Sequence, residues 1–140
     1  MKKKILLISG GTGGHVIPAV NFAKYLLKKN NNYKIILDKR GSKYINKYQG
    51  NMNIINSSNL YGGFFLKFFG IFNLLLGFLQ SIIIIFFYKP QIVLTFGSYA
   101  SFFPMICCVL LKPFYKIEIY IHEQNSVIGR TNRFFLNFAN

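Results

Sequence analysis

Short apolar runs that end in glycine or polar residues predict five β-strands. The runs are rich in Ile, Leu and Val and do not alternate with polar residues, a pattern typical of strands covered on both faces in a parallel sheet. The predicted strands are residues 4–9, 33–37, 54–55, 92–96 and 116–121.

Helical stretches alternate with these strands. They are residues 18–29, 43–48, 65–87 and 103–111, and a last one that begins near Gly129. Pro18 and Pro104 lie near predicted helix starts, whereas Pro90 and Pro113 lie just past predicted helix ends, as expected for a residue without a backbone N–H. Strand and helix in alternation over 140 residues predict one Rossmann-like α/β domain, a parallel sheet flanked by helices.

The apolar segment 64–88 is long enough to cross a membrane, since about 20 apolar residues do so. Its small and weakly polar residues recur every three or four positions and so share one helix face. They are Lys67, Gly70, Asn73, Gly77, Gln80, Ser81 and Tyr88. A helix that spans lipid has no need of such a stripe, whereas a helix packed on the sheet would turn it outward. We therefore favour a packed or interface-lying helix. A membrane span stays the alternative, and Lys67 and Lys89 would suit anionic headgroups in either case.

Charge and cysteine content limit the partners and the compartment. The chain has 17 Lys and Arg against 3 acidic residues, a net charge of +14. This charge admits a phosphorylated substrate or an anionic membrane surface as a partner, and a solvated basic surface without such a partner is the alternative. We do not expect nucleic acid, because the cations are spread along the chain without an RNA-binding or helix-turn-helix signature. The apolar run after Lys4 breaks at Ser9, too short for a signal peptide. Cys107 and Cys108 are adjacent in an apolar run and are interpreted as buried thiols. The short apolar run and the two thiols together predict a cytoplasmic protein.

Three polar loops follow predicted strands. Residues 9–18 (SGGTGGHVIP) hold four glycines and a histidine before a helix, which favours a bound phosphate. The loop lacks the Lys and the hydroxyl of a nucleoside triphosphate P-loop. A dinucleotide fingerprint would lack its third glycine, and an oxidoreductase with Asp38 as the ribose-binding acid is a weaker alternative.

The other two loops are residues 95–101 (TFGSYAS) and 122–125 (HEQN). Every side chain of residues 122–125 can donate or accept hydrogen bonds, which suits a hydroxyl-rich ligand. Because the carboxyl ends of parallel strands meet at one sheet edge, we expect all three loops to share one cleft. His15 and His122 have no ligand-spaced partners and the acidic residues are scattered, so we expect no metal.

Residues 10–19, 89–101 and 122–133 resemble, in order and spacing, the motifs of the MurG family of lipid-linked N-acetylglucosaminyltransferases. The resemblance implies the N-terminal, acceptor-binding half (residues 1–140) of a two-domain GT-B enzyme without a cofactor. Such enzymes transfer N-acetylglucosamine from UDP-N-acetylglucosamine to the C4 hydroxyl of lipid I with inversion, forming lipid II of peptidoglycan. The resemblance also implies a peripheral protein at the cytoplasmic face of the bacterial inner membrane.

The resemblance implies roles for particular residues. His15 matches the proposed base, and Glu123 is a second candidate. Residues matching the donor site are Thr12, Gly13, Gly14 and Asn125; those matching the acceptor site are Gly97, Tyr99, Ser101, His122 and Glu123. A base is needed to take the acceptor hydroxyl proton, and histidine titrates near neutral pH.

The chain departs from the family pattern in three places. Ser98 stands where the family has the second glycine of a pair, the bulky Phe102 and Phe103 stand at a small pair, and residues 58–61 (SNLY) lack a basic residue. We expect the two Phe side chains to narrow the acceptor cleft.

The family's C-terminal donor domain is absent from these residues, so we expect negligible transfer by them alone. A separately encoded donor domain and a truncated product are the two alternatives. A non-catalytic, membrane-associated module that binds a lipid diphosphate is the main alternative.

Overall fold

The computed structural model describes residues 2–45, 48–58 and 63–140 and contains a five-stranded parallel sheet. Its strands are β1 (Ile5–Ile8), β2 (Tyr33–Asp38), β3 (Met52–Ile55), β4 (Ile92–Thr95) and β5 (Glu118–Ile121). They lie in the order β3-β2-β1-β4-β5, and every neighbouring pair is parallel. The Rossmann-like fold and the five predicted strands are confirmed, with ends that shift by one or two residues.

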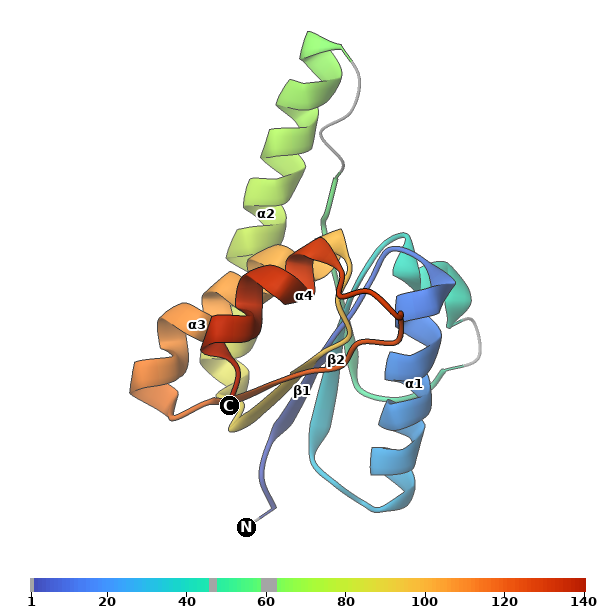
Figure 1. Ribbon diagram of the computed structural model, residues 1–140, viewed down its shortest axis with the longest axis vertical. Coiled ribbons are helices and arrows are strands. Elements are labelled where there is room, and N and C mark those ends of the chain that lie inside the picture. Colours follow the sequence, from blue (N-terminus) through green and yellow to red (C-terminus); the bar gives the residue numbers. More distant parts are fainter. Residues whose placement is uncertain (1, 46–47, 59–62) are drawn as a thin grey trace.

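Helices cover both faces of the sheet (Figure 1). They are α1 (Gly13–Lys28), α2 (Phe64–Tyr88), α3 (Phe102–Tyr115) and α4 (Arg130–Phe135). Leu7 of β1 packs in one apolar cluster with residues of α1, whereas Leu6 and Ile8 pack in a second with Ile85 of α2 and Met105 of α3. Successive strand residues point to opposite faces, so two covered faces require a continuous apolar run.

Two helix boundaries differ from the predictions because each helix contains a proline. Helix α1 begins at Gly13, before Pro18, and α3 continues past Pro113 to Tyr115. Each proline removes one backbone donor from its helix, and the buried apolar face on the sheet keeps the helix continuous. The segment predicted as a helix at 43–48 is a 3₁₀ turn, Gly41–Tyr44, and residues 46–47 lie outside the described residues.

From Gly70 to Tyr88 the small-residue stripe of α2 faces the protein, so its predicted outward orientation is wrong there, whereas Lys67 is exposed. Gly77 and Ser81 are buried, and a Cβ on Gly77 would overlap the carbonyl oxygen of Asn56. Gln80 Oε1 accepts a hydrogen bond of 2.8 Å from the backbone N–H of Asn56, and Tyr88 Oη donates to the carbonyl of Ile5 at 3.1 Å. The stripe therefore permits close approach to the body of the protein and bonds to its backbone.

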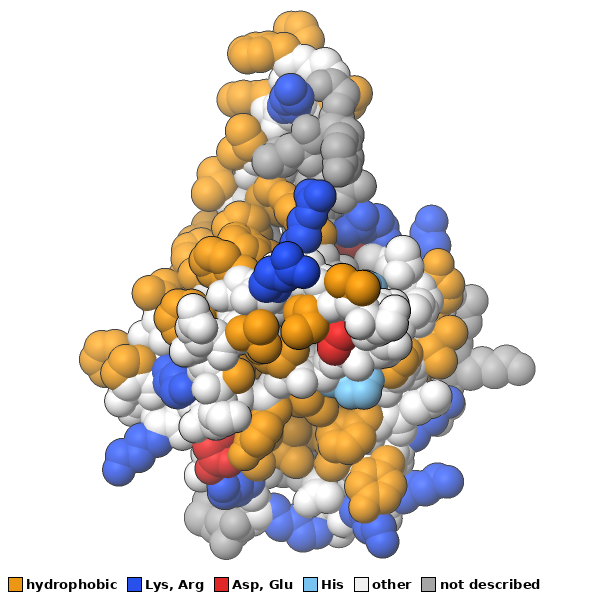
Figure 2. Space-filling model, in the orientation of Figure 1, with side chains coloured by type: hydrophobic (Ala, Val, Ile, Leu, Met, Phe, Trp, Pro, Cys, Tyr) orange, Lys and Arg blue, Asp and Glu red, His pale blue; other side chains and the backbone are white. Residues whose placement is uncertain are grey.

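The outward face of α2 is apolar as a consequence. The N-terminal part of the helix extends away from the body of the molecule, and hydrophobic side chains cover it (Figures 1 and 2). Phe65, Phe68 and Phe72 are 77%, 63% and 56% exposed. By length and composition α2 is able to cross a membrane. Of its most apolar 18-residue stretch, 28% is buried in the protein.

Cys107 and Cys108 of α3 are free thiols buried in the core, as predicted. Burial raises the pKa of the Cys107 thiol to about 12, so it stays protonated at neutral pH.

Candidate active site

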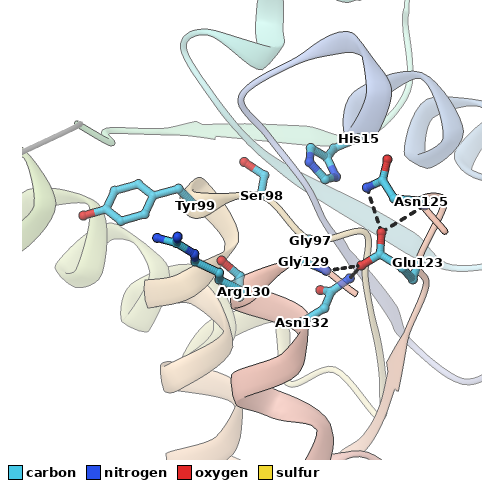
Figure 3. A pocket seen from close by; sticks show the side chains of 10 residues that line it. His15, Gly97, Ser98, Tyr99, Glu123, Asn125, Gly129, Arg130 and Asn132 are labelled. Carbon is cyan, nitrogen blue, oxygen red and sulfur yellow. Dashed lines mark hydrogen bonds between the residues drawn. The ribbon is translucent and has the colours of Figure 1, made fainter. Parts of the chain in front are cut away.

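The three polar loops meet at the carboxyl edge of the sheet and line one cavity of about 340 Å³ (Figure 3). The lining residues are His15, Gly97, Ser98, Tyr99, Glu123, Asn125, Gly129, Arg130, Thr131 and Asn132. His15 and Asn125 lie beside each other at one end, and Tyr99 and Arg130 lie at the other. The predicted shared cleft is thus confirmed. A membrane span that puts the His15 and His122–Asn125 loops on opposite sides of a bilayer is excluded.

The buried carboxylate of Asp38 fastens the first loop. Its Oδ1 accepts hydrogen bonds from the backbone N–H groups of Gly11 at 2.7 Å and Gly41 at 2.9 Å. Its Oδ2 accepts from Arg40 Nε and Ser57 Oγ, each at 2.8 Å. Burial opposes ionisation, but these four donors outweigh it and lower the pKa of Asp38. All its bonds serve the protein's own loops, which leaves the ribose-binding alternative without support.

Thr12 stands at the N-cap position of α1, and its carbonyl accepts the first hydrogen bonds of the helix, from the amides of His15 at 3.2 Å and Val16 at 3.1 Å. Gly13 and Gly14, predicted as loop residues, form the first turn of this helix. Amides of a first turn have no partner within the helix and favour an anion. Gly13 and Gly14 therefore belong to the start of a helix, where they offer amide donors, and not to an extended loop.

The second loop turns sharply through two residues with left-handed backbone angles, Gly97 (φ +79°) and Ser98 (φ +86°). Ser98 Oγ accepts from the amide of Ala100 at 3.3 Å, and the hydroxyl of buried Ser101 donates to the carbonyl of Gly97. A Cβ on Gly97 would approach the Asn132 side chain to 3.0 Å. The turn thus directs Tyr99 to the cavity, while Ser101 holds the loop from beneath.

Glu123 organises the third loop with both carboxylate oxygens. Its Oε1 accepts from the backbone N and Nδ2 of Asn125 at 3.1 and 2.9 Å. Its Oε2 accepts from the amide of Gly129 at 2.9 Å and Asn132 Nδ2 at 3.0 Å. Partial burial disfavours the charge, yet these hydrogen bonds lower the pKa of Glu123 to about 2. A carboxylate held in this way is a weak base.

The two histidines have different environments. His15 lies in the cavity, and its Nδ1 lies 2.8 Å from the carbonyl oxygen of Phe96. His122 is exposed; its ring packs against Phe96 with centroids 5.0 Å apart, and its carbonyl accepts from Asn132 at 3.1 Å. Of the two, His15 is the one whose ring faces the cavity.

The predicted site residues divide by position. Those that line the cavity are His15, Gly97, Tyr99, Glu123 and Asn125, whereas Thr12, Gly13, Gly14, Ser101 and His122 support the loops around it. Ser98, Gly129, Arg130, Thr131 and Asn132 also line it but were not singled out as site residues. They lie within the quoted motifs, and Arg130, the first residue of α4, places a cation five positions after the polar loop, which is the signal that identifies this segment.

Phe102 and Phe103, expected to narrow the cleft, are not among its lining residues. Phe102 packs on Phe135 with centroids 5.6 Å apart, and Phe103 packs on Phe78 at 5.9 Å. They face the core because helix α3 begins at Phe102 and turns its first residues toward α2 and α4. Residues 59–61 of the departure at 58–61 lie outside the described residues. Within the described residues, no three His, Cys, Asp or Glu side chains gather as a metal site requires.

The N-terminal domain of glycosyltransferase family 28 matches residues 5–140. The chain belongs to this family. Two relatives, from Rickettsia typhi and Rickettsia prowazekii, are 40% and 39% identical to this family 28 domain over 98% of its length. Both are named UDP-N-acetylglucosamine–N-acetylmuramyl-(pentapeptide) pyrophosphoryl-undecaprenol N-acetylglucosamine transferase. The domain spans 34% of the length of each of these relatives.

Solved structures support the same fold. MurG of Acinetobacter baumannii matches 99% of the family 28 domain with a TM-score of 0.80 at 24% identity, over 40% of its own chain. The Streptomyces glycosyltransferase SsfS6 matches 94% with a TM-score of 0.63 at 12% identity, over 42% of its chain. The domain thus has the fold of one part of a glycosyltransferase.

Proposed function

We propose that this chain is the acceptor-binding half of an inverting N-acetylglucosaminyltransferase that transfers N-acetylglucosamine from UDP-N-acetylglucosamine to lipid I, forming lipid II. The observation that carries the proposal is the shared cavity, in which His15 at the first glycine-rich segment faces Asn125 of the last loop. The transferase names of the Rickettsia relatives support this chemistry.

In this proposal His15 is the base that takes the proton from the acceptor hydroxyl. Its ring lies in the cavity, whereas Glu123, the second candidate, is committed to four hydrogen bonds and has a lowered pKa. We assign Glu123 to holding the loop. The first-turn amides of Gly13 and Gly14, with Asn125, suit a sugar nucleotide, and Gly97 and Tyr99 of the second loop suit the acceptor.

The proposed donor site needs a second domain, because the family match is to an N-terminal domain and the chain spans about a third of its relatives. We expect no measurable lipid II synthesis by residues 1–140 alone and transfer once a donor domain is supplied. In that two-domain protein, His15→Asn is expected to lower kcat by about 10²–10⁴-fold. Tyr25→Phe, on the exposed side of α1, is the matched control. Undiminished transfer by His15→Asn contradicts the assignment.

We further propose that α2 docks the protein on an anionic membrane at the cytoplasmic face of the bacterial inner membrane. The support is its exposed aromatic face, with Lys67 on the projecting part, in a protein of net charge +14. Burying each Phe contributes about 1.5–3 kcal/mol, and lysines add attraction to anionic headgroups.

Flotation with vesicles of anionic phospholipid tests the docking. Phe65→Ser/Phe68→Ser/Phe72→Ser is expected to reduce binding more than tenfold, whereas Leu27→Ser, an equally exposed apolar position on α1, leaves it unchanged. Equal binding by the triple variant and the unmodified protein contradicts the proposal.

A further inference from the structure

The ring of His15 is held through its Nδ1 atom, and its other ring nitrogen is Nε2. Nδ1 lies 2.8 Å from the backbone carbonyl oxygen of Phe96 and also contacts the side-chain amide of Gln124. Phe96 follows β4 and Gln124 follows β5, so two loops distant in sequence converge on one ring nitrogen. Gln124 is partly buried and is not a lining residue of the cavity.

The chemistry of these partners determines where the imidazole proton lies. A carbonyl oxygen only accepts hydrogen bonds, so Nδ1 must carry a hydrogen and donate it to Phe96. A neutral imidazole with hydrogen on Nδ1 has its lone pair on Nε2. The Phe96 carbonyl therefore favours the form in which Nε2 is the basic atom.

The amide of Gln124 completes the arrangement. An NH₂ group cannot donate to an N–H, and Gln124 Oε1 is buried without a hydrogen-bond partner in the part of the chain that the structure describes. With the two ends of the amide exchanged, Oε1 faces the Nδ1–H of His15 and accepts from it, so Gln124 and the Phe96 carbonyl share that hydrogen. The exchange replaces the donor–donor contact by a hydrogen bond from His15 to Gln124.

We propose that Gln124 is a positioning residue that, with the Phe96 carbonyl, holds His15 as its Nδ1–H tautomer and leaves Nε2 as the basic atom of the site. The catalytic consequence rests on the proposed function. The acceptor hydroxyl oxygen bonds to the anomeric carbon, the bond from that carbon to the diphosphate oxygen breaks, UDP leaves with the electron pair, and the hydroxyl proton passes to Nε2. An amide is uncharged at every pH in the working range, so Gln124 orients the ring without adding charge beside it.

The tautomer is directly measurable in the chain itself. Since the chain has 2 histidines, two-bond ¹⁵N–¹H correlation spectra of the labelled protein at about pH 8 contain two ring patterns, and His122→Gln assigns them. We expect the Nδ1–H pattern for His15. We expect Gln124→Leu to lower the Nδ1–H fraction and Gln124→Glu, which keeps an acceptor oxygen, to retain it. Gln91→Leu, at the residue just before β4, is the matched control, and circular dichroism verifies folding of each variant.

A mainly Nε2–H pattern for His15 in the unmodified protein overturns the inference, as does an unchanged Nδ1–H fraction in folded Gln124→Leu. In the two-domain enzyme we expect Gln124→Leu to lower kcat about 10–100-fold with little change in KM, and Gln124→Glu to recover part of it with a shifted pH profile. If the tautomer behaves as stated but His15→Asn keeps full transfer, the inference is supported and the proposed base is wrong. If Gln124→Leu loses transfer with the tautomer unchanged, the inference is wrong and the proposed function stands.

Discussion

Removing the Asp38 carboxylate is expected to release the first glycine-rich segment from the sheet. Asp38 is 1% exposed, and its four hydrogen bonds join the backbone of Gly11, the backbone of Gly41, Ser57 and Arg40. Asp38→Ala removes every one of these bonds. Asp38→Asn is the matched variant. It keeps Oδ1 as the acceptor for the two backbone donors and loses Oδ2, the acceptor for Arg40 and Ser57.

The magnitude follows from what each variant leaves unsatisfied. A buried donor without an acceptor costs about 1–3 kcal/mol, so losing the acceptor for the Gly11 and Gly41 amides predicts a loss of about 3–4 kcal/mol in the free energy of unfolding for Asp38→Ala, allowing for entry of water. Asp38→Asn retains those two bonds, and we expect a loss of about 1–2 kcal/mol. Against a typical stability of about 5–15 kcal/mol, the difference is large enough to measure.

Urea unfolding followed by circular dichroism at pH 7 gives both values, and amide hydrogen exchange at Gly11 reports on the loop itself. Exchange at Gly11 is expected to accelerate in Asp38→Ala and much less in Asp38→Asn. Because the folded protein lowers the pKa of Asp38 from its ordinary 3.8, the carboxylate's contribution is present above about pH 4 and lost as the pH falls through the folded pKa. A loss below about 1 kcal/mol for Asp38→Ala, or equal losses for both variants, refutes the reasoning.

Three further predictions concern the other loops and α2. Since Glu123 has a pKa of about 2 in the folded protein against an ordinary 4.5, its stabilisation is complete above about pH 4.5 and is lost toward pH 2; thermal unfolding of Glu123→Gln should vary less over that range, and equal pH dependence would count against this. Ser98→Gly should leave the free energy of unfolding unchanged or raise it by up to about 1 kcal/mol, because glycine relieves the strain of φ +86°. Ser98→Ala keeps the strain and loses the hydrogen bond to Ala100, so its free energy of unfolding should fall by about 1 kcal/mol. The reverse ranking of the two variants in urea unfolding would contradict this. Gly77→Ala should lower stability by about 2–3 kcal/mol through overlap with the Asn56 carbonyl, although the same change in an exposed helix gains up to about 1 kcal/mol; a raised Tm would show the contact to be soft.

The positions of the strands and the location of the site were predictable from local patterns. Strands buried on both faces need continuous apolar residues, so β1 and β4 stand out in the sequence. In a parallel sheet the loops after the strands share one edge, which predicts that the His15 and Asn125 segments lie in one cleft, as they do. Helix ends were less predictable, because Pro18 and Pro113 are locally unfavourable inside a helix and are tolerated only through packing on the sheet.

The amino-acid sequence by itself determined the alternation of strand and helix, the excess of positive charge and the presence of three polar loops, since these depend on residue type and spacing along the chain. Tertiary structure decided the orientation of α2, whose small residues face inward because the backbone near Asn56 approaches Gly77. It also decided that His15 meets Gln124, 109 positions away. Periodicity defines the faces of a helix but not the neighbour each face meets, and that neighbour is set only when distant segments pack together.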